Sequence, residues 1–120
     1  MPTSGAELKD RLARSREIEI GVIGRKSRRL ISNPVWFVLE GDQLYLVPVQ
    51  GSDTQWYKNL LQHWRIRISV DGVEGEFEAA PVTDPKVVSS VVEKFRKKYG
   101  PKDVKKYYSK FDVAVIVKLD

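Results

Sequence analysis

The most constraining feature of this sequence is a hairpin pattern centred on the dipeptide Asp71-Gly72. Residues 65–71 alternate isoleucine and valine with arginine and serine, and residues 73–82 carry glutamate at every second position over most of their length. Alternation with period two is typical of strands with one buried face, and Asp-Gly favours the tight turn that joins two such strands. The pattern predicts an antiparallel hairpin whose outer arginines and glutamates form a solvated face.

Four further apolar runs predict strands, over residues 17–23, 30–39, 43–49 and 111–119. The second run contains Asn33-Pro34, and because proline removes a ladder donor we expect a bulge, a bend or a sheet edge there. Short strands, bends and close turns favour a small closed or half-open barrel. The expected fold class is therefore α+β to mainly β, with six strands and flanking helices.

Four helices are expected around this barrel, over residues 6–14, 54–63, 85–99 and 102–110. The first belongs to a loosely docked N-terminal arm, residues 1–15, of a single domain that covers residues 1–120. The second places Trp56, Leu60 and Trp64 on one apolar face, with Ser52 and Asp53 positioned to cap it. The third is bounded by the Asp84-Pro85 cap and by Gly100.

Composition narrows the class of function. The sequence has no cysteine and a single histidine, His63, which argues against thiolate chemistry, histidine-rich metal sites and a Ser-His-Asp site. No run of 18 apolar residues and no signal peptide is found, so we expect a cytoplasmic chain without a membrane partner. The net charge of +5 favours an anionic ligand.

Residues 24–29, Gly-Arg-Lys-Ser-Arg-Arg, form a basic turn between two of the apolar runs. Closely spaced cations repel one another, so such a cluster favours a bound anion. Backbone N–H groups at a hairpin tip suit phosphate oxygens in particular. The alternative interpretation is a solvated turn that keeps a sheet edge soluble.

Three motifs, in this order, resemble the deazaflavin-dependent nitroreductase family over roughly residues 15–119: Gly24-Arg25-Lys26-Ser27, Asn33-Pro34 and Trp56-Tyr57-Lys58-Asn59-Leu60. Members of that family are split β-barrels related to the flavin-binding pyridoxamine-phosphate-oxidase barrels. The resemblance implies a homodimer that binds coenzyme F-420 (8-hydroxy-5-deazaflavin). It also implies an oxidoreductase that passes hydride between the reduced deazaflavin and a small electrophilic acceptor, such as a quinone, an activated alkene or a nitro compound.

The resemblance assigns cofactor binding to three groups of residues. The basic turn would hold the phosphate, through Arg25, Lys26, Ser27 and Arg28. The cleft near the ring would be lined by Pro34 and Trp36, and backbone groups would come from Val49, Gln50 and Gly51. The helix wall would be completed by Trp56, Tyr57 and Asn59. No metal is implied, and the candidate proton donors are Tyr57 and Tyr99, with Tyr107 and Tyr108 as further tyrosines to consider.

The chain also departs from the family pattern. Arg28 stands where glycine is usual, Ile31 where arginine is usual, and Gln50 where a lysine is often found. These changes favour an acceptor other than a nitro compound. Three alternatives remain open: the same barrel binding FMN, whose single phosphate needs fewer cations; a basic barrel that binds single-stranded nucleic acid; and a cofactor or lipid carrier without catalysis.

Overall fold

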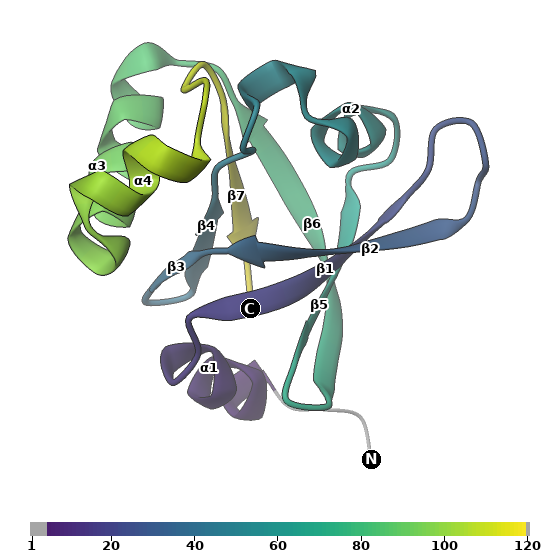
Figure 1. Cartoon of the computed structure of the whole chain (residues 1–120). Helices are drawn as coiled ribbons and strands as arrows, with labels where there is room; N and C mark the ends of the chain where they lie inside the picture. The colour runs from purple at the N-terminus through teal and green to yellow at the C-terminus, as the bar shows by residue number, and fades with distance from the viewer. Residues whose placement is uncertain (1–4, 120) are drawn as a thin grey trace.

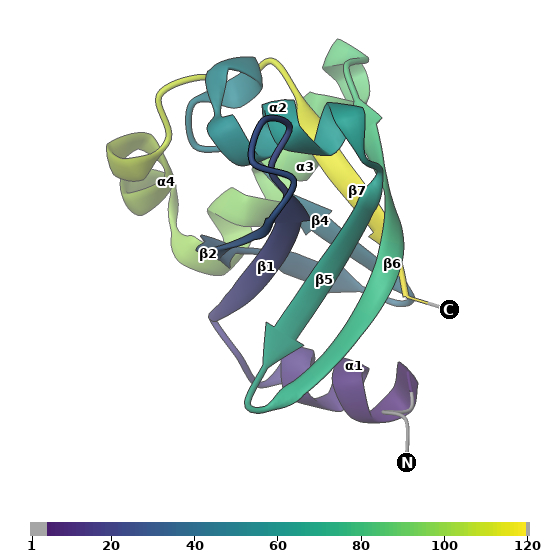
Figure 2. The ribbon, with the colours of Figure 1, turned by 90° about the vertical axis from the view of Figure 1, so that its right-hand side faces the viewer.

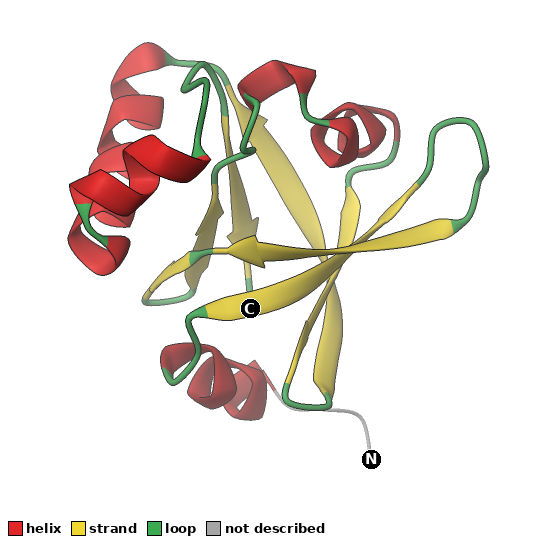
Figure 3. Ribbon diagram, in the orientation of Figure 1, coloured by secondary structure: helices red, strands yellow, loops and turns green. Residues whose placement is uncertain are grey.

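The computed structural model describes residues 5–119 as one antiparallel sheet that curls into a half-barrel flanked by helices (Figures 1 and 3). The strands are β1 Glu17–Ile23, β2 Leu30–Trp36, β3 Val38–Glu40, β4 Gln43–Leu46, β5 Arg65–Val70, β6 Val73–Val82 and β7 Ala114–Lys118. The helices are α1 Gly5–Ala13, α2 Gln55–Gln62, α3 Pro85–Tyr99 and α4 Pro101–Tyr107, with a 3-10 turn, η1, at Gly51–Asp53. None of the helices within residues 5–119 is long and apolar enough to cross a bilayer.

The strand order is β2-β1-β5-β6-β7-β4-β3, so the two outermost strands are neighbours in sequence. A single residue, Phe37, joins β2 at one edge to β3 at the other. The long strand β6 also serves both halves, because Val73–Glu78 pair with β5 and Ala79–Val82 pair with β7. These two shared segments bend the sheet into the barrel seen in Figure 2.

Phe37 corrects the predicted strand count from six to seven. The expected strand over residues 30–39 is broken at Phe37, where the chain leaves β1 and begins to pair with β4. The backbone of Phe37 is held by α3 instead: its N–H donates to the Tyr99 hydroxyl at 3.0 Å, and its carbonyl accepts from Lys98 Nζ at 2.8 Å. Pro34 does not interrupt β2, because an edge strand tolerates a missing donor.

The β5–β6 hairpin confirms the prediction made from Asp71-Gly72. Both turn residues have positive φ, +51° and +78°, as a tight turn between twisted strands requires. Arg65 lies opposite Glu78 and Arg67 opposite Glu76. The Arg67–Glu76 ion pair is 3.5 Å long and exposed, so this face is solvated, as expected.

The barrel interior and the space under α3 hold two separate hydrophobic clusters. Trp56, Tyr57 and Leu60 of α2 point into the barrel. Leu8 and Leu12 of α1 are also buried there, which contradicts the loosely docked arm, because both side chains are almost completely removed from water. The helix therefore contributes to the core instead of resting on it.

Helix boundaries follow local signals where those are strong. The Asp84 carboxylate accepts the Lys86 N–H at 2.9 Å and caps α3, which ends at Gly100 with φ +96°, as predicted. The expectation for Trp64 is wrong: α2 ends at Gln62, and the Trp64 side chain is 67% exposed. Strand β4 and β7 are shorter than expected, and α4 ends at Tyr107.

Candidate functional site

A cleft of about 360 Å³ lies between β2 and α4. Three residues assigned to the cofactor from the sequence meet there, Pro34, Trp36 and Val49. The remaining lining residues are Glu17, Val35, Tyr107 and Tyr108. The cleft is thus mainly apolar and aromatic, with one carboxylate, a composition typical of small-molecule sites.

Trp36 forms a fixed aromatic wall in this cleft. Its indole stacks on the Tyr99 ring with 4.2 Å between ring centroids and 8° between planes. The ring of Tyr107 meets it edge-on at 5.4 Å. Because one face of the indole is held by Tyr99, the Trp36 side chain is preorganised for a planar ligand.

The Tyr99 hydroxyl is bound to backbone. It accepts the Phe37 N–H and lies 2.6 Å from the Arg16 carbonyl and 2.8 Å from the Phe37 carbonyl, between which it shares its one proton. Burial raises the pKa of Tyr99 to about 12. Its role as a proton donor stays a prediction. Its hydrogen bonds connect α3 to the backbone of Phe37, between β2 and β3, and to the backbone of Arg16, before β1.

Trp56 and Tyr57 do not line the cleft. Both side chains are buried in the barrel cluster, so packing explains their presence. Burial, together with the negative charge of Asp112, raises the pKa of the Tyr57 hydroxyl. That hydroxyl makes no hydrogen bond within residues 5–119, and its role as a donor also stays a prediction.

The basic turn divides into one inward and several outward cations. The Asn59 side-chain oxygen accepts from Arg25 twice, from its backbone N–H at 3.1 Å and from its guanidinium at 2.7 Å. Gln55 accepts a further guanidinium bond at 2.9 Å. Asn59 is buried, so two of the predicted site residues hold each other in place. Because both acceptors are neutral amides, the charge of Arg25 is not cancelled.

The other turn residues point to solvent. Lys26, Ser27, Arg28 and Arg29 are exposed. The Ser27 hydroxyl accepts the Arg29 N–H at 3.3 Å, and Arg28 has φ +63°, a left-handed conformation that suits the glycine usual at this position. The Lys26, Arg28 and Arg29 side chains form no ion pair within the described part of the chain.

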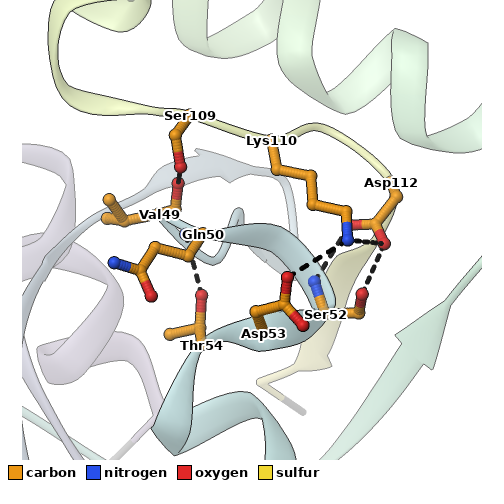
Figure 4. A network of polar contacts seen from close by, with 8 residues as sticks. All are labelled: Val49, Gln50, Ser52, Asp53, Thr54, Ser109, Lys110 and Asp112. Atoms are coloured by element: carbon orange, nitrogen blue, oxygen red, sulfur yellow. Dashed lines mark hydrogen bonds and ion pairs between the residues drawn. The ribbon is translucent and has the colours of Figure 1, made fainter.

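The loop after β4 is clamped to the segment after α4 (Figure 4). Asp112 accepts from the Ser52 N–H at 2.9 Å and from the Ser52 hydroxyl at 2.5 Å. Lys110 forms an ion pair with Asp53 at 3.2 Å. The Ser52 hydrogen bonds hold the pKa of Asp112 below its ordinary value, and the bond to Asp53 raises the pKa of Lys110.

The clamp also occupies most of the backbone groups predicted to meet the cofactor. The Val49 carbonyl accepts from the Ser109 N–H, and the Gln50 N–H donates to the Thr54 hydroxyl. Gly51 adopts φ +55°, and a Cβ there would collide with the Asp112 carboxylate. What this loop offers the cleft is chiefly the exposed Val49 side chain.

The same clamp leaves the start of α2 uncapped. Ser52 and Asp53, expected to cap this helix, bind Asp112 and Lys110 instead, and the Thr54 hydroxyl makes no cap hydrogen bond. The first-turn N–H groups of α2 therefore stay available, beside the Arg25 guanidinium that binds Gln55. A helix N-terminus next to an uncancelled arginine is a favourable place for an anion.

The cleft and the turn lie at opposite ends of β2. Trp36 pairs with Glu17 at one end of the β1–β2 ladder, and Leu30 pairs with Ile23 at the other. Six residue steps at about 3.3 Å each separate them by roughly 20 Å. The start of α2 and Arg25 belong to the side of the turn, so a ligand that reaches both sites must be long.

The fold is a half-barrel of seven antiparallel strands with flanking helices, and an apolar, aromatic cleft lies beside it. The sequence model of the family described as "Uncharacterized protein conserved in bacteria (DUF2255)" matches residues 8–119, and the chain belongs to that family. A search among curated proteins finds none that matches.

Solved structures share the fold. An F-420-H2 dependent reductase (FDR-A) is 16% identical with a TM-score of 0.67, over 86% of this chain and 94% of its own. A protein described as a domain-swapped dimer is 18% identical with a TM-score of 0.67, over 86% and 80% of the two chains. The heme storage protein HutZ from Vibrio cholerae is 10% identical with a TM-score of 0.69, over 98% and 90%. At these identities the similarity establishes the fold alone.

Proposed function

We propose that this protein is an oxidoreductase that binds a flavin-type coenzyme, with the deazaflavin F-420 as first candidate. The observation that carries the proposal is the aromatic cleft at one end of β2, with the uncapped start of α2 and Arg25 toward the other end. An aromatic wall suits a flat ring system, and helix N–H groups beside an arginine suit a phosphate. The reductase with the same fold supports the choice of coenzyme.

Each group of residues would have a separate task. Pro34, Trp36 and Val49 would hold the ring, and Arg25 with the first turn of α2 would hold the phosphate. When bound, the coenzyme supplies hydride chemistry, and the protein supplies orientation and shielding from water. The acceptor would be a small electrophile, such as a quinone, an activated alkene or a nitro compound. Tyr107, exposed at the cleft, is the tyrosine best placed to deliver a proton there.

The length of the site favours the deazaflavin over FMN. Roughly 20 Å separate the cleft from the far end of β2, where three further cations stand in solvent. FMN ends in a single phosphate, for which Arg25 and α2 would suffice. A coenzyme with a phosphodiester and a polyglutamate tail would also place negative charge near Lys26 and Arg28. FMN is the alternative coenzyme.

A heme is less well suited to this chain, although the heme storage protein shares the fold. The single histidine, His63, follows α2 and does not line the cleft. Without a histidine near Trp36, the cleft lacks the commonest ligand of heme iron.

The test is a fluorescence titration of the full chain with oxidised F-420, and with FMN in parallel. Arg25→Ala is expected to weaken binding by about 2 kcal/mol, because it removes a charge-assisted contact, whereas the outward Lys26→Ala should cost less than about 1 kcal/mol. Lys102→Ala on α4 is a control for the loss of one exposed charge. Equal effects of all three substitutions would show that only net charge matters. No binding of either coenzyme would reject the proposal.

We also propose that the protein forms a homodimer in the cytoplasm. A shared fold with a domain-swapped dimer supports the first part. A groove of about 680 Å³ over β5, β6 and β7 is the surface offered to a second subunit, with Trp64, Pro81 and Ile116 beside the charged side chains of Arg65, Glu76, Glu78 and Lys118. Light scattering on the purified chain tests this, and a monomer at micromolar concentration would contradict it. Trp64→Ser is expected to weaken the dimer.

A further inference from the structure

The tip of the β1–β2 hairpin combines unpaired cations with exposed aliphatic side chains. We define the hairpin-tip surface as Lys26, Arg28, Arg29, Leu30 and Ile31. Leu30 is 41% exposed and Ile31 40% exposed, and the three cations have no ion-pair partner among residues 5–119. The hairpin extends beyond the barrel on the right of Figure 1, and in Figure 2, where that side faces the viewer, its tip lies in front of α2, so the tip is accessible.

Leu30 and Ile31 each lie against a glycine. Leu30 contacts Gly21 of β1. A Cβ at Gly21 would come within 3.0 Å of the leucine side chain, so this close contact depends on the glycine. Ile31 similarly lies against Gly24. Leu30 and Ile31 are consecutive residues of β2, so each face of the hairpin end carries one exposed aliphatic side chain.

We propose that this surface binds an anionic lipid bilayer peripherally. Cations beside exposed aliphatic side chains are the pattern by which proteins lie on negatively charged membranes, with basic groups at the headgroups and apolar groups just below them. The inference goes beyond the proposed coenzyme site, and it departs from the expectation drawn from the sequence that no membrane is a partner. It requires no spanning segment.

Two other partner classes fit the surface less well. A nucleic acid would gain from the cations but not from Leu30 and Ile31, which cannot stack on bases. A folded protein partner would bury its anchors in a hollow, and the cleft beside Trp36 and the groove over β5–β7 are lined by residues outside 24–31. An accessible tip with mixed cationic and aliphatic character matches a fluid bilayer better than either.

The experiment is co-flotation of the full chain with vesicles of phosphatidylcholine alone or mixed with phosphatidylglycerol. Binding is expected only to the anionic vesicles and should weaken with salt. The Leu30→Ser/Ile31→Ser variant leaves every charge in place and should bind about tenfold more weakly. Lys26→Gln/Arg29→Gln should reduce binding about 30-fold. Lys102→Gln/Lys105→Gln, which removes the same charge from α4, is the matched control and should bind nearly as tightly as the unaltered chain.

Three outcomes would overturn the inference. One is no binding to anionic vesicles, and another is an equal loss for the α4 control, which would mean that net charge alone acts. The third is tighter binding to a single-stranded oligonucleotide that ignores Leu30→Ser/Ile31→Ser. Circular dichroism checks that each variant is folded. Because this variant leaves Arg25 and the cleft intact, its coenzyme affinity should be unchanged, so failure of either proposal is distinguishable from failure of the other.

Discussion

Replacing Tyr99 with phenylalanine removes only the hydroxyl that hydrogen-bonds the backbone of Phe37, where the chain passes from β2 to β3. The ring of Tyr99 can keep its stacking on Trp36, since phenylalanine retains the aromatic face. What is lost is the acceptor for the Phe37 N–H and the donor to the Arg16 and Phe37 carbonyls. The Phe37 carbonyl keeps its bond from Lys98, so the cost falls mainly on the N–H of a fully buried residue.

The expected loss follows from that single orphaned donor. A buried N–H without an acceptor costs about 1–3 kcal/mol in free energy of unfolding. For a chain of this length, each kcal/mol lowers the melting temperature by about 4 °C. The free energy is measured by urea unfolding with two spectroscopic probes, and an unchanged m-value would show that the native and unfolded states are otherwise the same.

Tyr107→Phe is the matched control. The Tyr107 side chain is 51% exposed, and its hydroxyl has no hydrogen bond within residues 5–119, so its removal should cost less than about 0.5 kcal/mol. Equal, small losses of unfolding free energy in the two variants would refute the conclusion that the Tyr99 hydroxyl stabilises the Phe37 backbone. In a turnover assay of Tyr99→Phe, a positioning role leaves the rate per folded molecule near normal, whereas a proton-donor role abolishes most of it.

Further predictions concern the clamp and Lys98. Gly51→Ala should lose about 2 kcal/mol in thermal unfolding, because alanine is strained at φ +55° and its Cβ would displace the Asp112 carboxylate. Asp112→Asn should cost about 0.5–1 kcal/mol at neutral pH, and the difference from the unaltered chain should vanish as pH falls through the lowered pKa of Asp112. Burial and Arg16 lower the pKa of Lys98 to about 8 from its ordinary 10.5. The folded chain then holds fewer protons than the unfolded chain above pH 8, so stability should rise from pH 8 to 10 by less than about 1 kcal/mol, a slope absent in Lys98→Met.

Features encoded by adjacent residues were predictable from the sequence. The β5–β6 hairpin and the cap of α3 depend on Asp71-Gly72 and Asp84-Pro85, whose conformational preferences act within a few residues. The cleft is an intermediate case: the resemblance assigned Pro34 and Trp36 to it and gave Val49 a backbone role, and the structure brings all three together through the Val49 side chain. Tyr107 and Tyr108 complete the aromatic lining of the cleft, and their place there follows from the packing of α4, which the sequence pattern does not determine.

Contacts between distant positions were not predictable. Ser52 and Asp112 are 60 positions apart, and a Ser-Asp pair before a helix has the composition of an ordinary cap. The break at Phe37 depends on a tyrosine 62 positions later. Tertiary partners outcompete the local preference in both cases, because a charge-assisted or buried hydrogen bond is stronger than an exposed cap. Within the loop, Gly51 is the residue whose type reflects the clamp, because its φ of +55° favours glycine and a Cβ there would meet Asp112.

The basic turn shows why adjacency in sequence is a poor guide to a shared role. Arg25 is the first residue of the turn, two positions after the end of β1, and its side chain reaches back to Gln55 and Asn59 of α2. The next residues turn away from the barrel and leave their cations in water. Because salt screens exposed charges more than a half-buried one, an anion bound at Arg25 should depend less on salt than one bound at Lys26 or Arg29. The four cations therefore form two surfaces, one directed at α2 and one directed outward, and a ligand or membrane that contacts one need not contact the other.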